Sequence, residues 1–153
     1  MDRSACLAIF ESNVPPFFEA EEQEDFARFL DTLSSPKSYY VMKNAEGVCV
    51  ACGGIKIEYQ QSLAKLRWDM VLQSMHYQGL GKLLLSYRLN RIAEIGNINT
   101  VLVGTSEYAV GFYEQMGFKR YQYTPNGIKP ELDEYLLKFE IVKDKRLVSG
   151  NTS

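Results

Sequence analysis

The segment "HYQGLGKLLL" (76–85) places two glycines where a predicted strand gives way to a predicted helix. Glycine inside a helix costs up to about 1 kcal/mol relative to alanine, so both positions need a physical reason. Gly79 and Gly81 permit a left-handed backbone and remove the Cβ atoms that would keep a ligand away from it. The first N–H groups of a helix lack partners within the helix and carry partial positive charge. The junction therefore predicts a phosphate-binding turn, to which Lys82 adds a full positive charge.

Two common nucleotide-binding motifs do not fit this turn. The dinucleotide fingerprint needs a third glycine where the chain has Leu84, and the P-loop needs Ser or Thr where it has Leu83. One alternative to phosphate binding stays open, in which the glycines only bring the helix close to the sheet.

The strand before the turn, residues 63–72, alternates strictly between apolar and polar residues, which predicts a half-buried strand. Its predicted apolar face consists of Ala64, Leu66, Trp68, Met70 and Leu72. Its predicted polar face consists of Lys65, Arg67 and Asp69.

The helix after the turn is predicted over residues 80–95, with Gly96 as its stop. Its apolar positions are spread widely around the helix: Leu80, Leu84, Tyr87 and Ile95 in one stripe, and Leu85, Leu89 and Ile92 in another. This breadth indicates burial against more than one neighbour, or against a partner subunit as in a homodimer.

Helical and alternating patterns place the remaining elements along the chain. Predicted helices cover 3–14, 17–33 and 107–116, the last ended by Gly117–Phe118, and predicted strands cover 38–44, 48–59, 98–106, 119–123 and 134–141. The last two strands form a hairpin whose turn is predicted to begin at Pro125–Asn126–Gly127. This order predicts a mixed α/β fold with a partly antiparallel sheet, a single domain over residues 1–141 and a polar tail at 142–153.

Composition excludes several classes of protein. A formal net charge of −2 argues against a nucleic-acid-binding protein, which usually carries a basic patch. No apolar run approaches the roughly 20 residues of a membrane span, and no secretory signal opens the chain. We therefore expect a cytoplasmic protein with no membrane contact.

The sequence contains three cysteines, and two of them form "CVAC" (49–52), which has the spelling of a redox or zinc motif. These residues fall in a predicted strand, in which positions three apart point to opposite faces. A zinc site would need more ligands, and only Cys6 and His76 could supply them. We interpret the cysteines as buried small residues and expect no metal.

Two motifs together resemble a known family. "HYQGLG" (76–81), between a strand and a helix, and "AVGFYEQMGF" (109–118) are similar to the motifs of the GCN5-related N-acetyltransferase (GNAT) superfamily. The order of elements fits from about residue 3 to residue 141, although family members usually have a short strand before the first helix. The resemblance implies an acyl-CoA N-acyltransferase fold, in which the parallel strands 63–72 and 98–104 splay apart and acetyl-CoA binds between them.

The resemblance also implies a set of residues that bind the co-substrate. The pantetheine arm and the acetyl carbonyl map onto the backbone of Asp69, Met70 and Val71. The pyrophosphate maps onto the backbone N–H groups of Tyr77, Gln78, Gly79, Leu80, Gly81 and Lys82. Ser106 stands where many members have an asparagine that contacts the cofactor. His76 replaces the usual Arg or Gln, and both a capping role and a phosphate contact stay open for it.

Acetyl transfer to an amine needs an acid for the departing thiolate, a donor for the oxyanion and a base for the amine. Tyr113 holds the family's general-acid position, and a phenol with a pKa near 10 is protonated at neutral pH. A backbone N–H near Met70 or Val71 would serve the oxyanion. Asp69 is the leading candidate for the base, with Glu58 and Glu107 behind it. A structural ion pair of Asp69 with Arg67 or Lys65 is the alternative.

The acceptor is expected to be a primary amine of a small molecule or peptide. Acidic residues crowd the start of the predicted helix 17–33, either as a solvated face or as an acidic rim that attracts a cationic amine. Aromatic residues of the segments that select the substrate could line its pocket: Phe17, Phe18, Tyr39, Tyr40, Tyr121 and Tyr123. A second hypothesis is an acetyl-CoA-binding regulatory module of the same fold without significant catalysis.

Overall fold

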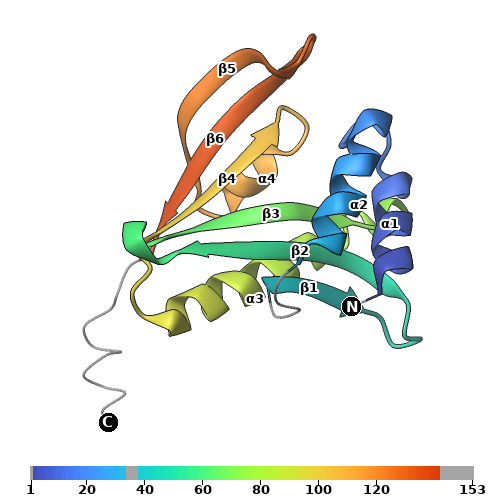
Figure 1. The fold of residues 1–153 in the computed structure, drawn as a ribbon, viewed down its shortest axis with the longest axis horizontal. Coiled ribbons are helices and arrows are strands. Elements are labelled where there is room, and N and C mark those ends of the chain that lie inside the picture. Colours follow the sequence, from blue (N-terminus) through green and yellow to red (C-terminus); the bar gives the residue numbers. More distant parts are fainter. Residues whose placement is uncertain (1, 34–37, 142–153) are drawn as a thin grey trace.

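The computed structural model describes residues 2–33 and 38–141, which form a six-stranded mixed sheet with helices on both faces (Figure 1). The strands lie in the order β1-β2-β3-β4-β6-β5. They are β1 (Tyr39–Lys43), β2 (Cys49–Glu58), β3 (Leu63–Val71), β4 (Thr100–Ser106), β5 (Lys119–Lys129) and β6 (Leu132–Glu140). This is the mixed, partly antiparallel sheet that the sequence predicts. The tail predicted at 142–153 lies outside the described residues.

Helices cover each face of the sheet with a separate hydrophobic core. On one face, α1 (Arg3–Ser12) and α2 (Gln23–Asp31) pack over β1, β2 and β3. On the other, α3 (Leu80–Ile95) and α4 (Val110–Gln115) pack over the centre of the sheet. We call these the α1/α2 face and the α3/α4 face. Among the helices of the described residues, none is both long and apolar enough to span a membrane.

Local signals set the helix ends. Gly79 and Gly96 flank α3 with φ of 79° and 93°, so both glycines adopt the left-handed conformation that suits them, and α3 has its predicted bounds. At the end of α4, the N–H of Gly117 donates to the carbonyl of Glu114 and that of Phe118 to the carbonyl of Tyr113. These two bonds form the predicted Schellman stop. Helix α2 starts later than predicted, because residues Ala20–Glu22 form a 3₁₀ turn before it.

Strands β3 and β4 are paired only at their first residues. Their parallel register joins Leu63 to Thr100, Ala64 to Val101 and Lys65 to Leu102, and the pairing stops there although both strands continue. Beyond this point β4 pairs with β6 alone, up to Ser106. The sheet therefore opens into a V between the second halves of β3 and β4, as the sequence resemblance implies.

A β-bulge in β3 corrects the predicted alternation. The pairing of β2 with β3 shifts between Cys52 and Gly54, and Trp68 has a left-handed φ of 51°. Residues Ala64 and Leu66 pack in the core of the α3/α4 face, whereas Trp68, Met70 and Leu72 pack in the core of the α1/α2 face. The apolar residues of β3 thus do not share one face, because the bulge exchanges the two faces midway along the strand.

The β5–β6 hairpin also differs from the prediction. The sequence Pro125–Asn126–Gly127 does not form its tip, because β5 runs on to Lys129, which pairs with Leu132. Instead, Asn126 takes a left-handed φ of 54° within an irregular stretch of β5. Asp133 holds this irregularity by accepting a hydrogen bond from the backbone N–H of Asn126 at 2.9 Å.

The three cysteines are free and buried. Cys49 and Cys52 both pack in the core of the α1/α2 face together with Cys6, so the prediction of opposite faces for the first two was wrong. The reason is a second bulge, this time in β2. Met42 pairs with Ala51 and the next residue of β1, Lys43, pairs with Cys49, so β2 has one extra residue between the two cysteines. Simple alternation fails across an inserted residue of this kind.

Candidate active site

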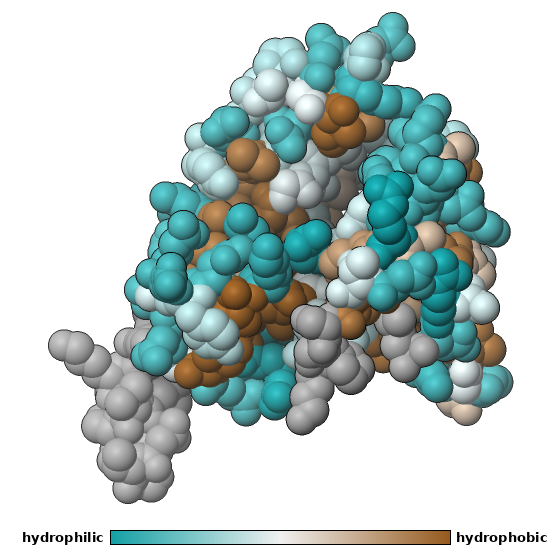
Figure 2. Space-filling view, in the orientation of Figure 1, coloured by the Kyte–Doolittle hydropathy of each residue, from teal (hydrophilic) through white to brown (hydrophobic). Residues whose placement is uncertain are grey.

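A cavity of about 850 Å³ occupies the opening between β3 and β4. Its lining includes Phe18 and Trp68 from the α1/α2 face, and Leu84 and Phe112 from the α3/α4 face. The cavity therefore passes through the gap in the sheet and connects its two faces. The space-filling view shows the molecule hollowed between the β5–β6 hairpin and helices α1 and α2 (Figure 2).

The cavity gathers nearly all of the residues predicted for the site. They are Asp69, Met70, Val71, Tyr77, Gly79, Leu80, Gly81, Lys82, Ser106 and Tyr113, and Gln78 is the exception. Three further residues of the lining are charged and were not predicted as site residues, namely Arg88, Glu22 and Arg67.

The glycine turn brings the start of α3 against the cavity. Within α3 the N–H of Leu83 donates to the carbonyl of Gly79 at 3.1 Å. The N–H groups of the first helical residues before it have no helical carbonyl to bond, so they are open to a ligand. A Cβ on Gly81 would lie 3.4 Å from the Phe112 ring and 3.5 Å from Val71, so this backbone lies close to both walls. Nothing lies within 4 Å of a Cβ built on Gly79. The turn thus has the open N–H groups of a phosphate-binding site, with exposed Lys82 beside it.

The end of β3 offers one free peptide edge to the cavity. The N–H of Leu72 donates to the carbonyl of Val50 at 2.8 Å, so Leu72 faces β2. In an antiparallel ladder successive residues face opposite edges, which turns the N–H of Val71 toward the gap left by β4. The carbonyl of Val71 accepts from Asn13 Nδ2 at 2.8 Å and contacts His76 Nε2 at 2.9 Å.

His76 therefore helps to shape the end of β3. Its ring also meets that of Phe17 edge-on at 5.2 Å, and both residues line the cavity. Ser106 is buried, and its hydroxyl accepts a hydrogen bond from the N–H of Tyr108 at 3.2 Å. This bond stabilises the turn before α4, in keeping with the capping ability of serine.

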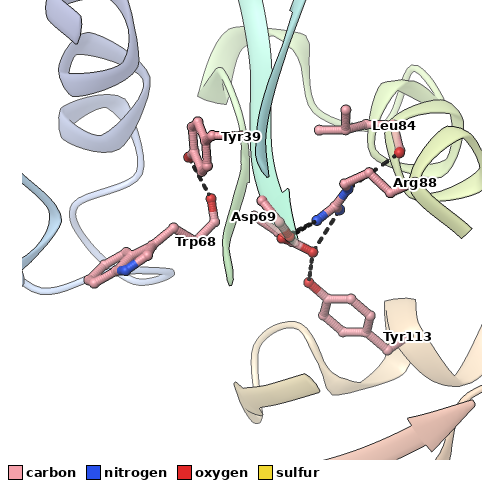
Figure 3. Close-up of polar contacts among 7 residues, drawn as sticks. Tyr39, Trp68, Asp69, Leu84, Arg88 and Tyr113 are labelled. Carbon is pink, nitrogen blue, oxygen red and sulfur yellow. Dashed lines mark hydrogen bonds and ion pairs between the residues drawn. The ribbon is translucent and has the colours of Figure 1, made fainter. Parts of the chain in front are cut away.

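Asp69 and Arg88, which both line the cavity, form an ion pair (Figure 3). Arg88 donates from Nη1 to Asp69 Oδ1 at 2.6 Å and from Nη2 to Oδ2 at 2.8 Å. The Tyr113 hydroxyl donates to the same Oδ2 at 2.8 Å. The three side chains come from β3, α3 and α4, and Arg88 is only 1% exposed. A carboxylate with both oxygens engaged in this way is poorly placed to take a proton from an amine.

Burial and charge act on the two partners of Asp69. Burial raises the pKa of Tyr113 well above its ordinary value, and the negative charge of Asp69 raises it further, while the charge of Arg88 opposes the increase. Burial alone would lower the pKa of Arg88, but the charge and hydrogen bonds of Asp69 outweigh burial and raise it. Tyr113 is thus protonated and Arg88 charged at neutral pH.

The other pairings considered for Asp69 do not occur. Arg67 lies over the ring of Phe29 at 5.0 Å on the α1/α2 face, and Lys65 is exposed. The weaker base candidates lie outside the cavity lining. Glu58 pairs with Lys56 at 3.4 Å, and Glu107 accepts from the N–H of Asp133 at 3.3 Å.

Glu22 is the second carboxylate among the described residues that line the cavity. Its Oε1 accepts a hydrogen bond from the N–H of Glu19 at 3.0 Å, and burial raises its pKa. Glu19 in turn forms an ion pair with Lys129 of β5 at 3.1 Å, which joins the segment before α2 to the hairpin. A carboxylate inside a run of acidic residues gave no signal of its own in the sequence.

Arg88 did leave a signal that the sequence analysis missed. It lies four residues after Leu84 and four before Ile92, in the middle of a stripe that is buried in the structure. A cation at such a position indicates a buried partner of opposite charge, because an unpaired buried charge is costly.

Parallel strands that diverge beside a helix begun by a glycine turn define the acyl-CoA N-acyltransferase fold. A model of the acetyltransferase (GNAT) family matches residues 6–118, and the chain belongs to this family. The family and fold predicted from the sequence are thereby confirmed.

The proteins compared below are distant from this chain in sequence. CgeE of Bacillus subtilis (strain 168), described as an uncharacterized N-acetyltransferase, is 30% identical over 79 residues, a match that covers 51% of this chain and 30% of CgeE. An aminoglycoside 6′-N-acetyltransferase complexed with coenzyme A shares the fold with a TM-score of 0.72 and 14% identity, over 93% of this chain and 92% of the other. The ribosomal-protein-S18-alanine N-acetyltransferase from Escherichia coli has a TM-score of 0.71 and 18% identity, over 94% and 90%.

Proposed function

We propose that this chain is an acetyl-CoA-dependent N-acetyltransferase in which a primary amine attacks the thioester directly. The observation that carries the proposal is the continuous cavity through the gap between β3 and β4. Donor and acceptor can enter such a cavity from opposite faces and meet inside the sheet. No covalent enzyme intermediate is then required.

The donor is assigned to the side formed by α3 and α4. The open N–H groups at the start of α3 and the side chain of Lys82 suit the pyrophosphate of acetyl-CoA. The N–H of Val71 faces the gap and suits the carbonyl oxygen of the acetyl group, which becomes an oxyanion during attack. Val71 is favoured over Met70 because Met70 lies two residues before Leu72 in the ladder and therefore turns its N–H toward β2, as Leu72 does.

The acceptor is assigned to the α1/α2 side, lined by Phe17, Phe18, Trp68 and Glu22. Aromatic faces and a carboxylate together favour an amine that arrives as a cation. A general base works best when its pKa lies near the working pH, and burial raises the pKa of Glu22 in that direction. Glu22 is therefore a better candidate than Asp69 to receive the proton of the ammonium group. The acceptor class is thus an ammonium-bearing small molecule or a peptide N-terminus.

The reaction balances with these residues. Glu22, or water that it orders, takes a proton from the ammonium group, and the neutral nitrogen attacks the acetyl carbon. The C–N bond forms, the C–S bond breaks, and the acylated nitrogen loses its second proton to water, which leaves a neutral amide. The Tyr113 hydroxyl donates a proton to the departing sulfur, and the phenol is later reprotonated by solvent.

Thiol release measures this function directly. Purified protein is mixed with acetyl-CoA and, in turn, with an aminoglycoside, spermidine, free amino acids and a peptide that begins with alanine. We expect at least one amine to release free coenzyme A above the amine-free rate. Tyr113→Phe should lower kcat by about 100-fold or more with little change in the affinity for acetyl-CoA.

Binding separates this proposal from that of a regulatory module. A ligand at about 100 times its Kd stabilises the folded state by about 2.7 kcal/mol. Acetyl-CoA should therefore raise Tm in the wild type and in Tyr113→Phe alike. A rise in Tm without turnover of any amine would favour the module, and no rise at saturating acetyl-CoA would refute both functions.

A further inference from the structure

The pair of Asp69 and Arg88 carries a cost that packing alone does not explain. Moving two charges out of water is expensive, and apolar residues of similar size often give equal or better stability. Arg88 is 1% exposed, and only 14% of the Asp69 side chain is exposed. A buried pair at the wall of a cavity therefore suggests a functional reason.

Two neighbouring strands, β3 and β2, are shaped around this pair. The bulge at Trp68 turns the Asp69 side chain toward the α3/α4 face. Gly53 of β2 leaves the space that the pair fills, because a Cβ there would lie 2.9 Å from Arg88 Nη1 and 3.0 Å from Asp69 Oδ1. Arg88 Nη1 also donates to the carbonyl of Gly54 at 3.1 Å. The guanidinium is thus fixed from several sides.

Tyr113 is the third member of the network. Its ring is 5% exposed and lies edge-on to Phe112 and Phe118, with centroids 5.1 and 5.6 Å away. Packing fixes the ring, and the hydrogen bond to Asp69 fixes the direction of the hydroxyl. Figure 3 shows this bond between the Tyr113 hydroxyl and the Asp69 carboxylate.

We propose that Arg88 and Asp69 are positioning residues, in which Arg88 holds the carboxylate and Asp69 holds the Tyr113 hydroxyl in place beside the cavity. This inference rests on the proposed function, in which Tyr113 donates a proton to the departing sulfur. Because Arg88 occupies both carboxylate oxygens, Asp69 competes less strongly for the phenolic proton. Rotation about the C–O bond of Tyr113 then redirects that proton to the sulfur.

A titration tests the network without any acceptor amine. Tyrosine labelled with ¹³C at Cζ gives one signal per tyrosine, and the signal lost in Tyr113→Phe is that of Tyr113. The charged side chains that act on Tyr113 are Asp69 from β3 and Arg88 from α3. In the wild type the Tyr113 signal should stay unchanged up to a pH at which a tyrosine side chain free in water has lost its proton.

Asp69→Asn keeps an acceptor for the hydroxyl but removes the negative charge, so Tyr113 should titrate at lower pH than in the wild type. If this variant does not fold, the neutral double variant Asp69→Asn/Arg88→Gln should show a smaller shift in the same direction. A Tyr113 signal that titrates like a tyrosine side chain free in water in the wild type, or identically in wild type and variants, would overturn the proposal.

Kinetics then test the positioning role with the best amine of the panel. Asp69→Asn should lower kcat at least about tenfold and leave KM for acetyl-CoA within about twofold. In the Tyr113→Phe background the same substitution should have no further effect on kcat, because Asp69 acts through Tyr113. A merely structural role would lower kcat equally in both backgrounds and would overturn the inference.

A matched control removes an exposed charge pair of the same type. Asp31 and Arg3 form an ion pair with side chains 56% and 46% exposed. Asp31→Asn should leave both the Tyr113 signal and kcat unchanged. If no amine of the panel is acetylated, the titration still decides whether the pair controls Tyr113, so failure of the proposed function remains distinguishable from failure of this inference.

Discussion

Removing one partner of the pair formed by Asp69 and Arg88 should destabilise the fold more than any surface substitution. Asp69→Asn leaves the Arg88 guanidinium, which is 1% exposed, without a counter-charge. Its remaining acceptors are the carbonyls of Gly54 at 3.1 Å and Leu84 at 3.4 Å. Leaving a buried charge uncompensated typically costs about 3–5 kcal/mol.

Arg88→Gln should cost less than Asp69→Asn. Asp69 keeps the hydrogen bond from the Tyr113 hydroxyl, and its side chain retains 14% exposure to water. The double variant contains a neutral amide pair and no unpaired charge, so it should be more stable than the sum of the single effects implies. We expect a coupling energy of about 1–3 kcal/mol.

Urea unfolding of the wild type, the two single variants and the double variant provides the full cycle. For a chain of this size, 1 kcal/mol corresponds to about 2–4 °C in Tm, so Asp69→Asn should lower Tm by about 6–20 °C. Additive losses, or a loss below about 1 kcal/mol for Asp69→Asn, would show that the buried charges are solvated and would refute the reasoning.

Three further predictions concern Gly53, Glu22 and the cysteines. Gly53→Ala places its Cβ 2.9 Å from Arg88 Nη1 and should lower the free energy of urea unfolding by about 1–3 kcal/mol. The control Gly111→Ala, whose Cβ has nothing within 4 Å, should be neutral or stabilise α4 by up to about 1 kcal/mol. Equal losses in the two variants would contradict the steric explanation. Glu22→Gln should be more stable than the wild type at pH 7, because burial raises the pKa of Glu22 and so favours its neutral form. The difference in stability should vanish below about pH 4, where the side chain at position 22 is neutral in both proteins. Urea unfolding across this pH range measures the difference, and equal stability at pH 7 would contradict the prediction. The thiols of Cys6, Cys49 and Cys52 are 0%, 7% and 0% exposed, so a thiol reagent should label none of them until the protein is unfolded, and fast labelling of the native protein would show that they are accessible.

The parts of the fold that were predictable from the sequence are those set by neighbouring residues. The bounds of α3 follow from glycines at 79 and 96, each in a left-handed conformation that other residues rarely adopt. The stop of α4 follows from Gly117 and the apolar residue after it, whose N–H groups bond back within a single turn. Signals of this kind do not depend on what the rest of the chain does.

The hairpin shows why a local signal can mislead. Pro-Asn-Gly favours a turn in isolation, and the chain does take a left-handed residue at Asn126. The tip nevertheless lies further along, because Asn126 accepts a bond from the N–H of Glu131 at 2.7 Å and donates its own N–H to Asp133. Side chains across the hairpin convert the expected turn into an irregularity within β5.

The alternation pattern could not predict which face of the sheet Asp69 lies on, again because the deciding residues lie elsewhere in the chain. Strict alternation placed Asp69 with Lys65 and Arg67, and each residue of β3 fits that pattern on its own. The evidence against it lies on other elements: Gly53, which leaves room for the pair, and Arg88, which supplies the counter-charge. A strand glycine or a helix arginine is ambiguous alone, since the first can mark any bulge and the second can extend to solvent.

These two residues become informative only when they are considered together. A charge in the middle of the buried stripe of α3 requires an acid on the facing strand, and β3 has only Asp69 as an acid. For Asp69 to face α3 along with Leu66, which is an odd number of positions away, β3 must contain one inserted residue. The bulge at Trp68 supplies it, and with it the side chain that fixes Tyr113. The bulge in β3 thus brings one carboxylate to both the buried charge of α3 and the hydroxyl of the proposed proton donor.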